Sequence, residues 1–243
     1  MAKALPRPPV PGPAFIRLLA RLTEAEIAPS SPVLADRLGQ WIDWTRAVAV
    51  SRALDGKLPA IDAEAPFADT DAGECARVRA TLEDAIGADF TRAAGKPRGH
   101  GQAAEADAAS DYAPLRERYL SLQRSMLTAT GRLRGQLRDT LARRSADMAR
   151  LAEVDAVMES TLSPREHALL ATVPTLLERH FERLRQAAQT PPDGATAADA
   201  ATPTTHQGAW LKRFRQDMRD VLRAELDVRF HPIDALLAAL SPR

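Results

Sequence analysis

A long segment almost free of proline most constrains what this chain can fold into. Between Ser110 and Thr161 the only proline is Pro114, in the first turn of a helix that would begin there. Apolar residues recur in alternating steps of four and three, the period of a helix packed along one face: Leu115, Tyr119, Leu122, Met126, Ala129 and Leu133. A helix of about 50 residues would be about 75 Å long, which favours a long hairpin, a coiled coil or a dimer arm.

The next helix boundary is predicted at Ser163-Pro164-Arg165-Glu166. Serine caps a helix, proline suits its first position, and glutamate at the third can bond back to the cap. We therefore expect the chain to turn at 162–164 and to double back on the long helix as a hairpin. Pro174 is expected to kink the returning helix, and His231-Pro232 to break or kink the last one.

Composition favours helices throughout. Alanine, arginine and leucine are frequent, whereas aromatic residues make up 5% of the chain and only two are tyrosine. We predict an all-α helical bundle built around a long antiparallel helical hairpin. Two Ala-rich stretches with few large apolar residues are predicted to be disordered linkers. The predicted order is a Pro-rich disordered tail (1–13), an N-terminal helical region (14–93), a linker (94–110), the hairpin (111–188), a linker (189–208) and a C-terminal helix packed on the bundle (209–241).

The usual signatures of enzymes and of metal or redox sites are missing from the sequence. The single cysteine, Cys75, excludes an internal disulfide and any CxxC motif. His167 and His180 share a predicted helix but are too far apart to bind one metal ion as neighbours, and no phosphate-binding loop or nucleophile motif is present. We predict no enzyme activity, no cofactor, no metal and no catalytic residue. The longest uncharged apolar run, 168–177, is too short to cross a membrane, so we expect a cytoplasmic protein without membrane insertion.

Charge is distributed unevenly, although the formal net charge is only +1. Residues 111–150 hold nine arginines against four acids, and residues 60–110 hold ten acids against five bases, so the two blocks carry +5 and −5. Either the basic helix contacts nucleic-acid phosphates, or the two blocks complement each other within or between chains. The candidate contacts to a partner or to nucleic acid are Arg124, Arg132, Arg134, Arg138, Arg143 and Arg144.

Gly131 and Gly135 lie in the middle of the predicted long helix. Each costs about 1 kcal/mol relative to alanine in a helix interior. Their presence indicates close packing against a neighbour, a hinge, or simple tolerance of the cost.

Several blocks of the sequence resemble a known family. They include FIRLLARLTEAEI and ADRLGQWIDWTRAVAVSRAL near the N-terminus, MARLAEVDAVMESTL and SPREHALLATVPTLLERHFERLR in the hairpin, and MRDVLRAELDVRFHPIDALLAAL at the end. Together they are similar to a proteobacterial family of chains of this length that is known only as a domain of unknown function. The resemblance implies no catalytic residues. It implies a cytoplasmic accessory of an envelope-associated assembly, because genes of the family often lie near those of coiled-coil membrane proteins and peptidoglycan-binding proteins.

These observations together predict a helical interaction or scaffold protein that binds a protein partner or self-associates. The alternative is a nucleic-acid-binding protein that uses the Arg-rich face of helix 116–150.

Overall fold

The computed structural model describes residues 13–24, 39–56, 70–92, 111–189 and 203–241. Its main helices are α1 (Ala14–Thr23), α3 (Trp44–Asp55), α4 (Thr70–Arg92), α6 (Ala113–Arg144), α7 (Ala146–Leu170), α8 (Val173–Gln189) and α9 (Pro203–Leu240). No strand occurs in the part of the chain that is described, so the all-α prediction is confirmed. The proposed tail, the linker 94–110 and most of the linker 189–208 lie outside these residues.

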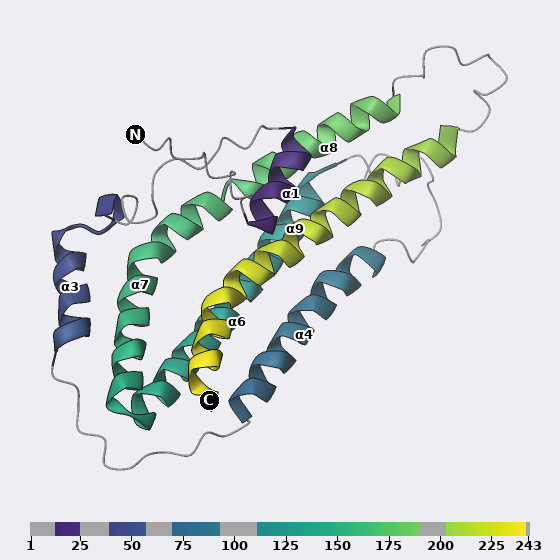
Figure 1. Ribbon diagram of the computed structural model, residues 1–243. Coiled ribbons are helices and arrows are strands. Elements are labelled where there is room, and N and C mark those ends of the chain that lie inside the picture. The colour runs from purple at the N-terminus through teal and green to yellow at the C-terminus, as the bar shows by residue number, and fades with distance from the viewer. Residues whose placement is uncertain (1–12, 25–38, 57–69, 93–110, 190–202, 242–243) are drawn as a thin grey trace, which may run out of the picture.

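The bundle is organised around α6 and α9, which pack along each other (Figure 1). Helix α9 also contacts α8, α4 and α1, whereas α6 contacts α7 along the hairpin. Helix α3 lies on the outer side of α7, away from α9 (Figure 1). The predicted packing of the C-terminal helix on the bundle is thus present, and this helix is the central one.

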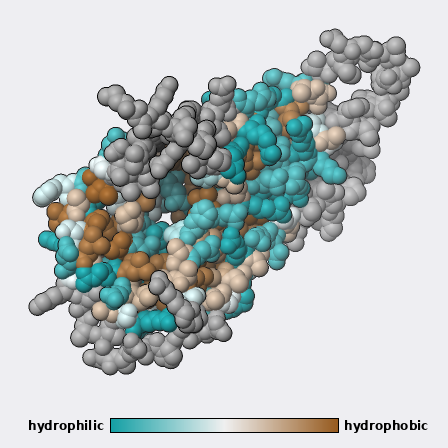
Figure 2. Space-filling model, viewed as in Figure 1, coloured by the Kyte–Doolittle hydropathy of each residue, from teal (hydrophilic) through white to brown (hydrophobic). Residues whose placement is uncertain are grey.

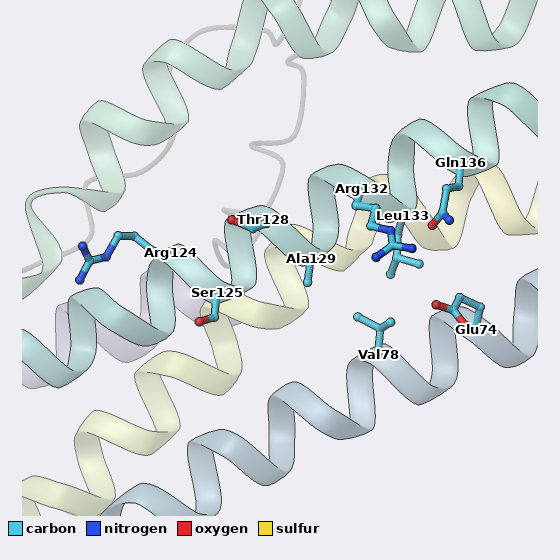
Figure 3. A pocket seen from close by; sticks show the side chains of 9 residues that line it. All are labelled: Glu74, Val78, Arg124, Ser125, Thr128, Ala129, Arg132, Leu133 and Gln136. Carbon is cyan, nitrogen blue, oxygen red and sulfur yellow. The ribbon is translucent and has the colours of Figure 1, made fainter.

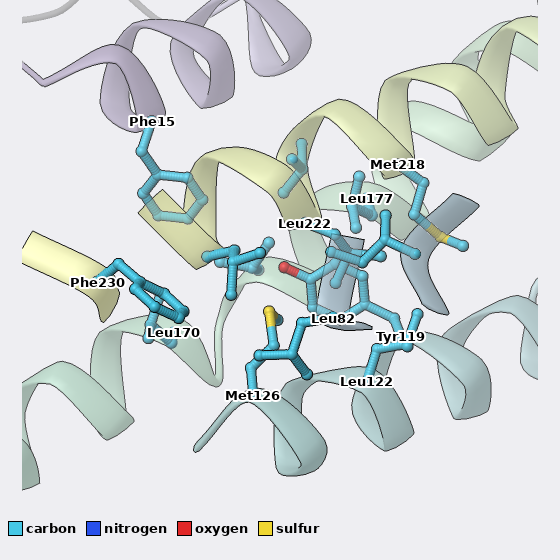
Figure 4. Close-up of a cluster of buried hydrophobic side chains, with 14 of the residues drawn as sticks. Phe15, Leu82, Tyr119, Leu122, Met126, Leu170, Leu177, Met218, Leu222 and Phe230 are labelled. Carbon is cyan, nitrogen blue, oxygen red and sulfur yellow. The ribbon is translucent and has the colours of Figure 1, made fainter. Parts of the chain in front are cut away.

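The core lies where α4, α6, α8 and α9 meet, and α1 closes it on one side. Figure 4 shows side chains from these helices converging, among them Phe15, Leu82, Tyr119, Met126 and Leu222. The apolar positions that were read from the sequence of α6 supply its buried face, since Tyr119, Leu122, Met126 and Leu133 are all buried. Cys75 is buried as well, and burial raises the pKa of its thiol, which keeps it protonated at neutral pH.

The turn of the hairpin lies at Ser145, so the predicted continuous helix from 110 to 161 is wrong. Ser145 is extended (φ −160°) and its hydroxyl accepts a hydrogen bond from the Met148 backbone N–H at 3.3 Å. Arg143 and Arg144 end α6 and Asp147 opens α7, so each charge stabilises the adjacent helix dipole. Helix α7 then returns antiparallel to α6 and contacts it along its length. With α6 ending here, the length argument for a coiled coil or a dimer arm no longer applies.

The predicted boundary at Ser163-Pro164 is also wrong, because α7 continues through Pro164 to Leu170. Proline removes the N–H that would bond to the carbonyl of Ser160. Both residues are exposed, so water can reach that carbonyl. The capping signal at 163–166 therefore does not decide the boundary.

The later prolines also behave differently from the prediction. Pro174 does not kink a helix, since it lies in the first turn of α8, where a missing N–H costs little. Helix α9 is not broken at Pro232 and runs to Leu240, whereas a kink at His231-Pro232 stays a prediction. Helix α9 also begins at Pro203, so residues 203–208 belong to this helix and not to the predicted linker. A proline inside a helix costs about 3 kcal/mol, whereas burying a large apolar side chain contributes about 1.5–3 kcal/mol. Ile233, Leu236 and Leu240 are all buried beyond Pro232, so packing outweighs the proline.

The N-terminal region contributes the short helices α1 and α3. Helix α1 ends at Thr23, followed by Glu24 in the left-handed region (φ 54°). Helix α3 begins after Asp43, whose carboxylate accepts a hydrogen bond from the Arg46 N–H at 2.8 Å. Trp41 precedes this cap and lies against the guanidinium of Arg165 on α7, 5.1 Å from the ring centroid.

Candidate interaction surface

Three of the six candidate arginines are engaged inside the bundle. Arg134 on α6 binds Asp155 on α7 through two hydrogen bonds, from Nε at 2.8 Å and from Nη2 at 2.7 Å. Arg138 binds Glu159, one turn further along α7, at 2.5 Å. Arg144 donates to the carbonyl of Leu240 at the end of α9. These three arginines bind α6 to α7 and α9, and their guanidinium groups already have partners within the bundle.

The Arg134–Asp155 pair is the best shielded of the ion pairs between α6 and α7. The two side chains are 16% and 12% exposed. Burial alone would lower the pKa of Arg134, but the hydrogen bond and the charge of Asp155 raise it above its ordinary value. The arginines Arg134 and Arg138 of the basic block are thus balanced by Asp155 and Glu159 of α7.

Three of the other arginines of α6 form an exposed row that is inclined to the helix axis. Arg116, Arg124 and Arg132 are spaced by eight residues, so each is displaced from the one before by about 12 Å along the helix axis and by about 80° around it. They belong to one ridge of side chains at every fourth position, which we call the α6 ridge: Arg116, Leu120, Arg124, Thr128, Arg132 and Gln136. Arg143 is also exposed but lies near the end of the helix.

A first pocket, of about 470 Å³, lies between α4 and the α6 ridge. Figure 3 shows Glu74 and Val78 of α4 facing Ala129, Leu133 and Arg132 of α6 across it. Its floor is apolar and its rim is charged, which suits an amphipathic occupant.

A second pocket, of about 280 Å³, lies on the other side of the ridge, where α6 meets the junction of α7 and α8. Arg116 and Arg124 line it from α6, His167 lines it from α7, and Arg229 reaches it from α9. Leu127, which is 39% exposed, adds an apolar side chain. Arg124 lines both pockets and so joins them into one surface.

A buried polar network lies behind this second pocket. Glu225 on α9 is fully buried, and one of its oxygens accepts hydrogen bonds from the Tyr119 hydroxyl at 2.7 Å and from the Gln123 amide at 3.1 Å. Its other oxygen accepts from Nε and Nη2 of Arg229, at 3.0 and 2.7 Å. Burial, followed by the charge of Glu225, raises the pKa of Tyr119 well above its ordinary value, so the hydroxyl remains a donor.

Sequence reasoning missed Glu225 and Arg229, although a signal was present. They are four residues apart and lie in the apolar stripe formed by Leu222, Leu226 and Phe230. Two opposite charges in the core face of a helix indicate a buried pair.

A second polar contact lies within an aromatic cluster between α8 and α9. His180 is buried, and its Nε2 lies 2.8 Å from Asp217, while Arg183 approaches its Nδ1 at 3.0 Å. Because an arginine can only donate, Nδ1 must accept, and Nε2 then donates to Asp217. Both ring nitrogens are therefore occupied. His167 lies apart from His180, in the second pocket.

Helix α6 passes through Gly131 and Gly135 without interruption. A Cβ built on either glycine would meet no atom within 4 Å among the described residues. Within that part of the chain no atom packs closely against either glycine, and a hinge or a contact with another protein stays a prediction.

We expect Gly131→Ala and Gly135→Ala each to raise the free energy of unfolding by about 0.5–1 kcal/mol, since alanine restricts the unfolded chain and the new methyl group meets open space. Urea denaturation followed by circular dichroism measures the change. A loss of stability in either variant would contradict the open space that the structure shows around that glycine.

Hydrophobic surface also gathers elsewhere. In Figure 2 brown surface lies at the left, where α3 and α7 lie in Figure 1. Trp44 and Leu54 of α3 and Leu151 of α7 are exposed by 83%, 48% and 38%.

Comparison with known families bears on the whole chain. A family model described as "Protein of unknown function (DUF3348)" matches residues 1–242. The chain belongs to this family. The resemblance to a family known only as a domain of unknown function is thereby confirmed, and DUF3348 membership itself assigns no activity. No curated protein and no solved structure matches this DUF3348 chain.

Two further findings concern the described residues of this DUF3348 protein. They contain no group of three or more histidine, cysteine, aspartate or glutamate side chains placed to hold a metal ion. None of their helices combines the length and the apolar character needed to span a membrane.

Proposed function

We propose that this DUF3348 protein is a helical interaction module that binds an acidic segment of a partner protein along the α6 ridge. The observation that carries the proposal is the separation of the α6 arginines. Arg134, Arg138 and Arg144 are used within the fold, whereas Arg116, Arg124 and Arg132 stand exposed in a row between two pockets. We place the protein in the cytoplasm as an accessory of an envelope-associated assembly, the setting that the family resemblance implies.

A protein partner fits this surface better than a nucleic acid does. The first pocket contains apolar side chains such as Val78 and Leu133, which a phosphate backbone would leave unfilled. An amphipathic acidic segment can satisfy the arginines and cover the apolar floor together. Arginine is also enriched among the residues that dominate protein interfaces.

The proposal predicts that Arg124→Gln/Arg132→Gln lowers partner recovery about tenfold or more, because interface arginines commonly contribute more than 1 kcal/mol each. The tagged full-length chain is purified from its native cells, and the co-purifying protein is quantified. The same interaction should weaken as salt screens the charges.

Arg143→Gln/Arg179→Gln is the matched control, because it removes two exposed arginines outside both pockets. Equal recovery with the ridge variant and the control would contradict the proposal. Capture of nucleic acid instead, with an affinity that falls steeply with salt, would favour the alternative function.

Light scattering on the purified chain tests whether the partner is a second copy.

A further inference from the structure

The second pocket combines a buried arginine with two exposed ones. The side chain of Arg229 is only 5% exposed, yet it lines the pocket together with Arg116 and Arg124. A buried cation at the floor of an open pocket differs from an ordinary surface arginine, because little water competes for its donors.

The network behind the pocket fixes the position of Arg229. Glu225 binds Nε and Nη2 on one edge of the guanidinium. Glu166 lies 3.5 Å from Nη1, beyond hydrogen-bond length for a well-formed bond, and its side chain is 40% exposed. The second oxygen of Glu225 is taken by Tyr119 and Gln123, so this carboxylate is fully used in holding Arg229.

The electrostatic character of the pocket wall follows from its residues. The wall contains Arg116, Arg124 and Arg229 with His167 and no carboxylate, while Glu225 and Glu166 contact Arg229 without lining the pocket. The pocket also meets the first turn of α8, at Pro174 and Thr175, which is the positive end of that helix dipole. Its occupant is therefore expected to be an anion.

We infer that this pocket receives one carboxylate side chain of the partner protein, with a neighbouring leucine-sized side chain of the partner lying on Leu127 and Leu120. The inference rests on the proposed function and names the group by which the partner is anchored. A volume of about 280 Å³ accommodates such a side chain and part of its neighbour. The exposed rim formed by Arg116, Arg124 and Leu127 leaves the site open, which suits a group presented by a larger molecule.

The experiment uses the full-length ¹⁵N-labelled chain and a blocked tripeptide, acetyl-Leu-Glu-Leu-amide, as the probe. We expect saturable shifts of the backbone amide signals of His167 and Thr175. The glutamine analogue, acetyl-Leu-Gln-Leu-amide, should bind about tenfold more weakly, since it lacks the charge that the arginines recognise. Equal affinity of the two peptides, or no binding of either, would overturn the inference.

Three variants locate the site. Arg116→Gln should weaken the tripeptide several-fold, whereas Arg132→Gln, which lies on the ridge but lines only the first pocket, should leave its affinity unchanged. Ala171→Trp fills the pocket without altering a charge and should abolish binding while the other amide signals keep their positions. Insensitivity to both Arg116→Gln and Ala171→Trp would overturn the assignment of the pocket.

The result also separates this inference from the proposed function. If partner capture depends on Arg124 and Arg132 but the tripeptide does not bind, the ridge functions without this anchor and only the inference fails. If the tripeptide binds but Arg124→Gln/Arg132→Gln leaves partner recovery unchanged, the pocket is a carboxylate site and the proposed function fails.

Discussion

Glu225→Ala is expected to lower the free energy of unfolding by about 3–5 kcal/mol, the range seen when one member of a buried ion pair is removed. The carboxylate accepts four hydrogen bonds, from Tyr119, Gln123 and two nitrogens of Arg229. Its loss leaves the buried Tyr119 hydroxyl and the Arg229 guanidinium without this acceptor. Among the described residues, Arg229 would then keep the distant, half-exposed Glu166 as its ion-pair partner. Urea denaturation followed by circular dichroism measures the effect.

Two control variants test the reason for this loss. Asp220→Ala removes a half-exposed carboxylate of the same helix that pairs with Arg223 at 3.6 Å, and it should change stability by no more than about 0.5 kcal/mol. The double variant Glu225→Leu/Arg229→Met removes both charges and should recover most of the loss. If the double variant is no more stable than Glu225→Ala, the unpaired charge of Arg229 is not the cause.

Phe214→Ala is expected to cost about 3–5 kcal/mol, as truncation of a fully buried phenylalanine usually does. Phe214 has no exposed surface, and its ring lies edge-to-face against Phe181 at 5.0 Å and Tyr112 at 6.1 Å. The cavity would open where the start of α6 and the helices α8 and α9 meet, because Tyr112 also bonds from its hydroxyl to the Pro174 carbonyl at 2.6 Å. Thermal or urea denaturation gives the change.

Trp44→Ala is the matched control for this aromatic truncation. Trp44 is 83% exposed on α3, so its loss should leave stability within about 0.5 kcal/mol of the original. A Phe214→Ala variant as stable as Trp44→Ala would mean that the α8–α9 packing does not hold the bundle together.

The helix boundaries show where local signals fail. Ser163-Pro164-Glu166 carried the stronger capping pattern, yet the chain turns at Ser145, where arginines end one helix and an acid begins the next. The ion pair of Arg134 with Asp155 matches a turn at Ser145, because the two residues lie at nearly equal distances on either side of it. Arg138 and Glu159 add a second ion pair between the same two helices. The free energy of these ion pairs depends on residues that are far apart in the sequence, so a local motif cannot predict it.

The candidate site divides in the same way. The sequence marked six arginines of one helix but could not separate them, because their roles depend on which helix covers which side of α6. Contact with α7 removes Arg134 and Arg138 from the exposed set, and it leaves Arg124 and Arg132 on the ridge beside Arg116.

What the sequence by itself determined was the helical class, the amphipathic faces and the family, because helix propensity, the apolar period and residue identity are local properties of the chain. What only the tertiary structure decided was the turn at Ser145, the passage of α7 and α9 through their prolines, and the burial of Glu225 with Arg229. In each case a local cost of a few kcal/mol is opposed by favourable packing or pairing with distant helices. That favourable free energy exists only once the helices have come together.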